Sequence, residues 1–226
     1  MSQLQQVEQK LRDMILGLEI GPGERLTERW IETRFEASRT PVRAALLHLE
    51  AEGLVCRDGR GWIVAPIDID ELAHLFVYRE VVEVAAVRLT CAAATAAQTT
   101  LNGLDEVAAM LQSCGPESSN EEWHRVGVDF HTLLARLSGN PYLSQGVQKA
   151  MTLLSRARWL EVRLEPARDR ALNEHLAILA AVRAGRAEVA ADLLGAHIRG
   201  SRERLLASLK DNRRSLRARG FKVVAG

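Results

Sequence analysis

Residues 38–49 read Ser-Arg-Thr-Pro-Val-Arg-Ala-Ala-Leu-Leu-His-Leu, and the spacing of their apolar members predicts a helix. Val42, Ala45, Leu46 and Leu49 recur at the three- and four-residue intervals that bring side chains to one helix face. Thr40 can supply the N-cap oxygen, with Ser38 as the alternative, and Pro41 suits the first helical position. Gly53 is expected to end the helix.

Two further helices are expected before this one. Leu4, Val7, Leu11 and Ile15 form an apolar stripe at helical spacing, and the breakers Gly21-Pro22-Gly23 end that helix. Thr27 can cap a second, short helix with Trp30, Ile31 and Phe35 facing inward.

After the third helix, the chain has the pattern of a β-hairpin. Asp58-Gly59 separates two β-prone runs, 54–57 and 60–65, and this pair is a strong hairpin signal because both turn residues tolerate positive φ. Three helices followed by a hairpin predict a winged helix-turn-helix, which Pro66 closes.

A winged helix places its third helix in the major groove of DNA. Arg39 and Arg43 share the exposed face of that helix, and the arginine fork fits guanine O6 and N7. We expect Thr40 and the wing residues Arg60 and Gly61 to contact phosphate or the minor groove, and Arg29 to lie along the phosphates. Alternatively each arginine is an ordinary solvated charge, but their gathering on one face favours DNA binding.

The same residues resemble the N-terminal domain of GntR-family transcriptional regulators. The resemblance rests on residues 20–26 (Ile-Gly-Pro-Gly-Glu-Arg-Leu), 38–46, 49–55 (Leu-Glu-Ala-Glu-Gly-Leu-Val) and 61–65. It covers residues 4–66 in order, and it implies DNA contacts at Arg29, Arg39, Thr40, Arg43 and Gly61.

The rest of the chain has only helical patterns, and no sheet is expected after Val64. We predict a mostly α protein: a winged helix-turn-helix domain over residues 1–66, then an all-α bundle over residues 67–226 for effector binding and dimerisation. Residues 199–226 carry nine basic and two acidic side chains. This basic end is expected to be a solvated helix end or a nucleic-acid contact.

The helical half resembles the FCD effector domain of the FadR-like branch of the same family. The matching segments are 78–83 (Tyr-Arg-Glu-Val-Val-Glu), 129–134 (Asp-Phe-His-Thr-Leu-Leu), 138–141, 174–179 (Glu-His-Leu-Ala-Ile-Leu), 184–186 and 196–198. The resemblance implies a divalent metal site at His131, His175 and His197, and an effector contact at Arg79. The family's usual carboxylate, four residues before the first histidine, is replaced by Gly127.

Two interpretations of this site stay open. A three-histidine centre with open positions suits zinc, nickel or iron(II), which a carboxylate effector could complete. Alternatively the domain binds an organic ligand without metal, or the histidines are core residues beside apolar stripes. Arg79 either clamps the effector or pairs with Glu83, one helical turn away.

Other side chains were assigned by position. Arg156, Arg158 and Trp159 are candidates to line the cavity. His124 and His74 match no motif, and we expect both at the surface or at a helix edge.

Composition excludes several classes of protein. With 30 basic and 29 acidic residues the net charge is +1, which excludes a uniformly basic nucleic-acid coat. Three scattered cysteines fit a reducing cytoplasm, and no apolar run is long enough for a membrane span or a secretion signal.

We therefore expect a cytoplasmic, homodimeric transcriptional regulator that is not an enzyme. It would be a repressor of a palindromic operator in double-stranded DNA, released or modulated by a small organic acid bound in the helical domain. The alternatives are a metal-dependent enzyme with a three-histidine centre, which lacks any recognised catalytic motif, and a helical interaction scaffold, which leaves residues 38–43 unexplained.

Overall fold

A computed structural model describes residues 1–115, 117–162 and 165–224, with the side chains of residues 160–166 left out. The chain forms two compact units, Met1–Asp70 with Leu209–Gly226, and Glu71–Ser208. Our expected division gave residues 67–226 to the second domain, whereas the structure groups the chain from Leu209 onward with the N-terminal unit.

The N-terminal unit begins with the expected helices, α1 (Gln3–Leu16), α2 (Glu28–Phe35) and α3 (Arg39–Ala51). The side chain of Thr27 accepts a hydrogen bond from the Trp30 amide at 3.2 Å and caps α2, as expected. Thr40 is not the cap of α3, because the helix begins at Arg39 and Ser38 holds the N-cap position without a side-chain hydrogen bond. Pro41 therefore lies within the first turn, where backbone amides have no helical partner to lose.

A small antiparallel sheet completes this part of the unit. Strands β1 (Arg25–Leu26), β2 (Val55–Asp58) and β3 (Gly61–Val64) lie in the order β1-β3-β2. The wing turn is Gly59-Arg60 rather than Asp58-Gly59, because Asp58 stays in the ladder opposite Gly61. Gly59 has φ +59°, which suits the first position of a two-residue turn.

One core joins the three helices to the sheet. Its fully buried members come from each element, because the apolar stripes of α1 and α3 face each other and the strands cover their end. They include Leu11, Ile15, Leu26, Ile31, Val42, Leu46, Leu49, Leu54 and Val64.

The C-terminal segment adds a second, parallel pair of strands, so our expectation of no sheet after Val64 was wrong. β4 (Ile67–Asp68) pairs with β5 (Val223–Val224), which follows the short helix α10 (Arg213–Ala218). The Lys222 amide donates to the Pro22 carbonyl at 2.7 Å. A Cβ on Gly21 would lie 2.7 Å from the Phe221 ring, and one on Gly23 2.4 Å from Lys222 Cβ. Both glycines thus allow the C-terminal segment to approach.

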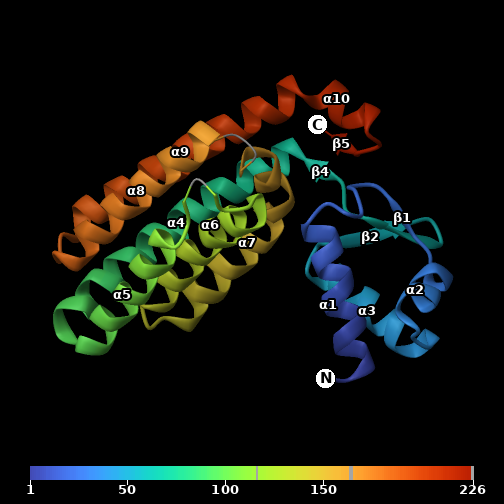
Figure 1. Cartoon of the computed structure of the whole chain (residues 1–226), viewed down its shortest axis with the longest axis horizontal. Helices are drawn as coiled ribbons and strands as arrows, with labels where there is room; N and C mark the ends of the chain where they lie inside the picture. Colours follow the sequence, from blue (N-terminus) through green and yellow to red (C-terminus); the bar gives the residue numbers. More distant parts are fainter. Residues whose placement is uncertain (116, 163–164, 225–226) are drawn as a thin grey trace. The chain divides into compact units, whose positions relative to one another are not determined.

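All the secondary-structure elements in the described part of the second unit are helices. It contains α4 (Ile69–Ala96), α5 (Gln98–Gln112), α6 (Asn120–Arg136), α7 (Pro141–Val162), α8 (Glu165–Arg183) and α9 (Ala187–Asp211). Figure 1 shows these helices side by side as a bundle, in which α6 packs along α7 and α5 contacts both α6 and α8. Among the described residues, no helix combines the length and the apolarity that crossing a bilayer requires.

Candidate functional site

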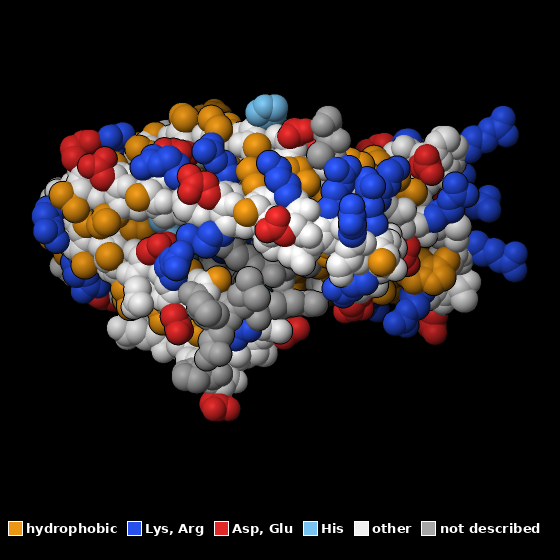
Figure 2. Space-filling view, turned by 90° about the horizontal axis from the view of Figure 1, so that it is seen from above, with side chains coloured by type: hydrophobic (Ala, Val, Ile, Leu, Met, Phe, Trp, Pro, Cys, Tyr) orange, Lys and Arg blue, Asp and Glu red, His pale blue; other side chains and the backbone are white. Residues whose placement is uncertain are grey.

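The predicted DNA contacts lie on the surface of the N-terminal unit. Arg29, Arg39, Thr40, Arg43 and Arg60 are exposed, and Gly61 is partly exposed at the start of β3. Figure 2 shows Lys and Arg side chains that project from the surface of this unit. The surface is therefore accessible to a polyanion.

Two glutamates of α2 lie beside the arginines of α3. Arg43 Nε donates to both carboxylate oxygens of Glu28 at 2.9 Å. Arg39 Nε lies 3.5 Å from Glu32 Oε1 and 3.9 Å from Glu28 Oε2. These pairs explain how a nearly neutral domain carries an exposed arginine face.

This face also has one apolar member that was not predicted from the sequence. Leu47 lies one turn after Arg43 on α3 and its side chain is half exposed. Apolar side chains on a recognition helix can contact the methyl group of thymine. A large apolar residue beside exposed arginines is the signal that could have identified it.

The three predicted histidines meet inside the second unit. His131 on α6, His175 on α8 and His197 on α9 are all buried, and one ring nitrogen from each lies within 4.8 Å of the others. The His131 ring lies 5.1 Å from that of His175 and 5.2 Å from that of His197. The His175 ring is stacked on Phe130 at 3.9 Å.

Glu174 sets the proton arrangement of two histidines. His197 Nδ1 lies 2.6 Å from Glu174 Oε2, so we place the ring proton on Nδ1 and leave Nε2 as the acceptor. His175 Nε2 lies 3.2 Å from His197 Nε2 and must donate to it, because two facing lone pairs would repel each other. In metal sites, a carboxylate commonly accepts a hydrogen bond from the ring nitrogen that does not bind the metal, and this bond orients the imidazole.

His131 is held at both ring nitrogens by residues of α4. Its Nδ1 lies 2.7 Å from Glu83 Oε2, and its Nε2 lies 2.8 Å from Arg79 Nη2. A proton on Nδ1 is donated to Glu83, and Nε2 then accepts from Arg79. Arg79 Nε also pairs with Glu83, so the ion pair, one of the two alternatives for Arg79, is present.

Burial is the main reason why all three histidines are neutral. It holds the pKa of His131 and of His175 well below the ordinary value of 6.5, and it also lowers the pKa of His197 although Glu174 opposes the shift. The positive charges of Arg79 and Arg158 lower all three pKa values further. Neutral imidazoles keep the lone pairs that a metal or a hydrogen-bond donor requires.

This cluster could hold a metal ion. The Nε2 atoms of His175 and His197 are separated by about the distance between two ligands of one tetrahedral ion. His131 would join them only after its Nε2 leaves Arg79, and His175 would have to carry its ring proton on Nδ1 instead of Nε2.

Gly127, at the position of the usual fourth ligand, faces an arginine. A Cβ placed on Gly127 would lie 2.9 Å from Arg158 Nη2. The Arg158 side chain on α7 is buried. A guanidinium therefore lies where the family's carboxylate would begin.

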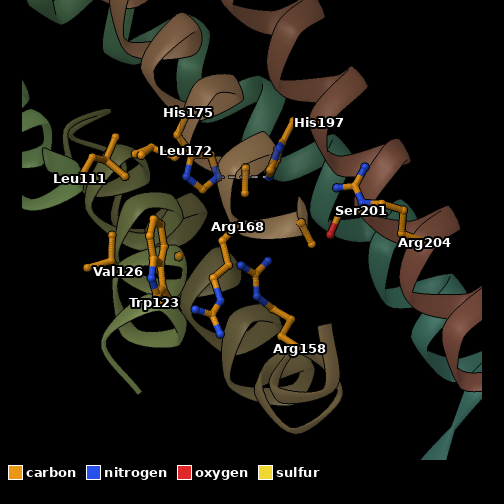
Figure 3. A pocket seen from close by; sticks show the side chains of 13 residues that line it. Leu111, Trp123, Val126, Arg158, Arg168, Leu172, His175, His197, Ser201 and Arg204 are labelled. Atoms are coloured by element: carbon orange, nitrogen blue, oxygen red, sulfur yellow. Dashed lines mark hydrogen bonds between the residues drawn. The ribbon is translucent and has the colours of Figure 1, made fainter. Parts of the chain in front are cut away.

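Beside the histidines lies a cavity of about 50 Å³. Figure 3 shows Arg158 in its middle, with Trp123, Val126 and Leu111 on one side and Ser201 and Arg204 on the other. The full lining is Leu111, Trp123, Val126, Gly127, Arg158, Ala167, Arg168, Ala171, Leu172, His175, His197, Ser201 and Arg204.

The structure separates the predicted pocket residues into two groups. His175 and His197 line the cavity, whereas Arg79 and His131 lie outside its lining and contact each other. Of the further candidates, Arg158 lines the cavity, while Arg156 and Trp159 do not.

Four side chains that line the cavity were not predicted from the sequence: Trp123, Arg168, Ser201 and Arg204. Ser201 and Arg204 follow His197 at intervals of four and seven residues, which repeat one helix face. This spacing was the available signal for those two residues.

His124 was expected at the surface, and that prediction was wrong, whereas His74 is exposed as expected. The His124 ring is buried and stacked on Trp159 at 4.8 Å, and its Nε2 lies 3.0 Å from the Ser155 carbonyl oxygen. Burial lowers the pKa of His124 to about 4, and the charge of Arg158 adds to the shift. His124 precedes the buried His131 by seven residues, which is two helical turns, so both side chains lie on the same face of α6.

Comparison with known proteins covers both units. Residues 3–64 match the family of bacterial regulatory proteins called gntR, and residues 74–200 match the FCD domain. The Nta operon transcriptional regulator of Aminobacter aminovorans is 30% identical over 155 residues, which are 66% of this chain and 70% of that protein. The transcriptional repressor RspR of Escherichia coli K12 is 25% identical over 179 residues, 79% of this chain and 78% of that protein.

A solved structure has the same fold. E. coli McbR/YncC superposes with a TM-score of 0.76 at 21% identity, covering 91% of this chain and 97% of that one. The two matched domains, taken in order, make this chain a DNA-binding transcriptional regulator with an effector-binding domain, and not an enzyme. It is a member of the GntR family, in the FadR-like branch that carries an FCD domain.

Proposed function

We propose that this regulator is a repressor whose affinity for a palindromic operator changes when a small organic acid binds in the cavity of the helical unit. The observation that carries the proposal is the cavity beside His175 and His197, lined with arginines, in a chain that also presents an exposed arginine face. The ligand acts through its different affinity for two states of the protein. The relative RspR is named a repressor, which supports repression over activation for this chain.

The DNA contacts proposed here are Arg39 and Arg43 to base edges, Thr40, Arg60 and Gly61 to phosphate or the minor groove, and Arg29 to phosphate. Exposure of these side chains supports the proposal. Arginine can exchange a surface carboxylate for a guanine edge because both accept two parallel hydrogen bonds.

A homodimer would supply the second half of a two-fold operator. Its proposed interface is an apolar strip on α4 and α9 of the second unit. Val81 is 66% exposed and Val189 45%, and two ion pairs, Arg88–Glu188 and Glu80–Arg199, join α4 to α9. Val77, Leu89 and Leu193 extend the strip. Large exposed apolar strips of this kind mark protein interfaces.

For the three histidines, zinc, nickel and iron(II) are the candidate ions, because imidazole suits all three. Such an ion would supply a Lewis-acidic centre to which a carboxylate binds. We place the protein in the cytoplasm, where its DNA is and where its cysteines, free in the described residues, stay reduced.

The first test is DNA binding by the full-length, untagged protein. Duplexes selected from a random pool should converge on a two-fold sequence, and affinity for it should fall steeply with salt. Enrichment of no sequence, or of a sequence without two-fold symmetry, would contradict the proposed operator.

Elemental analysis of the same preparation tests the metal. About one ion per chain, lost in a His175→Ala, His197→Ala double variant, would support the three histidines as ligands. A metal-free protein that still binds its operator would remove the ion from the proposal and leave the regulator intact.

A further inference from the structure

The helix α3 has an apolar side chain at the middle of its solvent face. Leu47 is half exposed and lies two residues from each of the buried Ala45 and Leu49, which is about 200° round the helix. Its side chain therefore points away from the core of the N-terminal unit, and it is not among the described residues that pack against that core.

Charged pairs lie on the two flanks of this solvent face. On one flank, Arg39 and Arg43 pair with glutamates of α2. On the other flank, His48 Nδ1 lies 2.8 Å from Glu8 Oε2 of α1. Leu47 lies between the two flanks, so the face is apolar in its middle and polar at its edges.

Leu47 is also the longest side chain in the middle of this face. Its neighbours there come seven and three residues before it and four residues after it, spacings that bring side chains to the same side of a helix. These neighbours are Thr40, Ala44 and Ala51. All three are short, so Leu47 projects beyond them toward any partner that covers the face.

Two other large apolar side chains are exposed in the described part of the N-terminal unit, and both differ from Leu47. Met1 is the first residue, and the Trp30 ring packs edge-on against the Phe35 ring at 6.3 Å. Single exposed apolar residues are common on protein surfaces. Leu47 is distinguished by its place on the helix that a winged helix-turn-helix inserts into the major groove.

The chemistry of this face fits a base pair that contains thymine. The thymine methyl group is exposed in the major groove, and an apolar side chain can pack on it. Leu47 follows Arg43 by one turn, about 6 Å along the helix axis, and successive base pairs are about 3.4 Å apart. Leu47 therefore reaches a base that lies one or two base pairs from the one that Arg43 contacts.

We propose that Leu47 is a specificity-determining residue that selects thymine by packing on its methyl group, one or two base pairs from the guanine bound by Arg43. The inference rests on the function proposed above, since it requires α3 to lie in the major groove of the operator. Arg43 reads its base by hydrogen bonds, and Leu47 reads the next position by apolar contact.

The test compares two forms of the operator duplex that the full-length protein selects from a random pool. In the second form, uracil replaces thymine at one position at a time, which removes the methyl group and leaves the hydrogen-bonding groups in place. At the position read by Leu47, wild-type affinity should fall about fourfold, the effect of one apolar carbon that is no longer buried. Competition gel shifts at one fixed salt concentration measure the change.

Variants of Leu47 show which side chain senses the methyl group. Leu47→Ala should bind the thymine and uracil duplexes equally, whereas Leu47→Met, which keeps a long apolar side chain, should retain the preference. The control Tyr142→Ala, at an exposed residue of α7, should behave like wild type. Thermal unfolding of Leu47→Ala should match wild type, because Leu47 lies outside the core.

The base pair bound by Arg43 is the one at which Arg43→Ala relaxes the selection. Two results would overturn the inference: a wild-type protein that binds uracil as well as thymine at every position within two base pairs of that site, or a Leu47→Ala protein that keeps the preference. A selected half-site with no thymine there has the same meaning. Each of these results leaves the two-fold operator intact, whereas a pool that yields no preferred sequence overturns both the operator and the role of Leu47.

Discussion

At the scale of single residues, Arg43 is bonded to Glu28 in the absence of DNA. Its Nε–H is shared between the two carboxylate oxygens of Glu28, and the pair is exposed, so it contributes little to stability. On DNA, Arg43 would exchange this one shared N–H for the two parallel hydrogen bonds that a guanidinium can donate to a guanine edge. At a wrong base the arginine would keep its contact with the glutamate.

Arg43→Ala should therefore reduce discrimination rather than general attraction. We expect the free-energy difference between operator and scrambled duplex to shrink by about 1–3 kcal/mol, the usual worth of a bidentate base contact. Competition gel shifts at one fixed salt concentration measure it. The matched control is Arg34→Ala, an exposed arginine of α2. Equal loss on both duplexes would assign Arg43 to phosphate instead.

His124 makes stability depend on pH at another single residue. Its pKa is about 4 in the folded protein against 6.5 ordinarily. Between these two values the unfolded chain binds a proton that the folded chain does not. The free energy of unfolding therefore falls as the pH drops from about 6.5 toward 4, by about 3 kcal/mol in all for this group.

Urea unfolding of wild type and His124→Gln across that pH range tests this prediction. The variant should lose stability less steeply below pH 6.5, and His74→Gln, at an exposed histidine, should follow wild type. Parallel curves for wild type and His124→Gln would show that the buried ring does not titrate as described.

At the scale of elements, local signals were sufficient for most of the fold. The helices and the wing were predictable because the apolar spacing and the breaker residues lie within each segment. β4 and β5 were not predictable: each has two residues, and their pairing joins Ile67 to Val223 at the far end of the chain. Nothing in either dipeptide indicates its partner.

The candidate site also has a part that was predictable from the sequence and a part that was not. The resemblance placed the three histidines on separate helices, and the structure brings them together. The sequence did not predict that His131 contacts Glu83 and His197 contacts Glu174. It also did not predict that Arg158 approaches Gly127. These contacts depend on how neighbouring helices are rotated about their axes. Helix periodicity tells which side of a helix is buried, not which residue of another helix it meets.

Gly23 lies against Lys222 of the C-terminal segment. A substitution at Gly23 should show how much this contact contributes to the stability of the N-terminal unit. It has φ +86°, and a Cβ there would lie 2.4 Å from Lys222 Cβ. Gly23→Ala should lower the free energy of unfolding of the N-terminal unit by about 1–3 kcal/mol.

Hydrogen exchange of the α1–α3 amides gives the readout for Gly23→Ala. The control Gly115→Ala, where nothing lies within 4 Å of the new Cβ, should have little effect. Unchanged protection in Gly23→Ala would mean that the C-terminal segment does not pack on this turn.

At the scale of the whole molecule, the strip on α4 and α9 predicts how the protein assembles. Val81→Arg places a charge in the middle of the proposed interface and should yield a monomer in sedimentation velocity. Operator affinity should fall with it, because two half-sites are no longer bound together. Tyr142→Arg, at an 83% exposed residue of α7, is the control. A Val81→Arg protein that remains dimeric would place the interface elsewhere.

The pairing of β4 with β5 also has a consequence for synthesis. The N-terminal unit includes the chain from Leu209 onward, so a nascent chain cannot complete this unit until the ribosome has made the helices of the second unit and the segment that contains β5. At ordinary elongation rates the ribosome needs on the order of ten seconds to make the intervening helices. During that interval the growing protein has its recognition helix but lacks β5, so the first domain to be started is still incomplete after the second has been made.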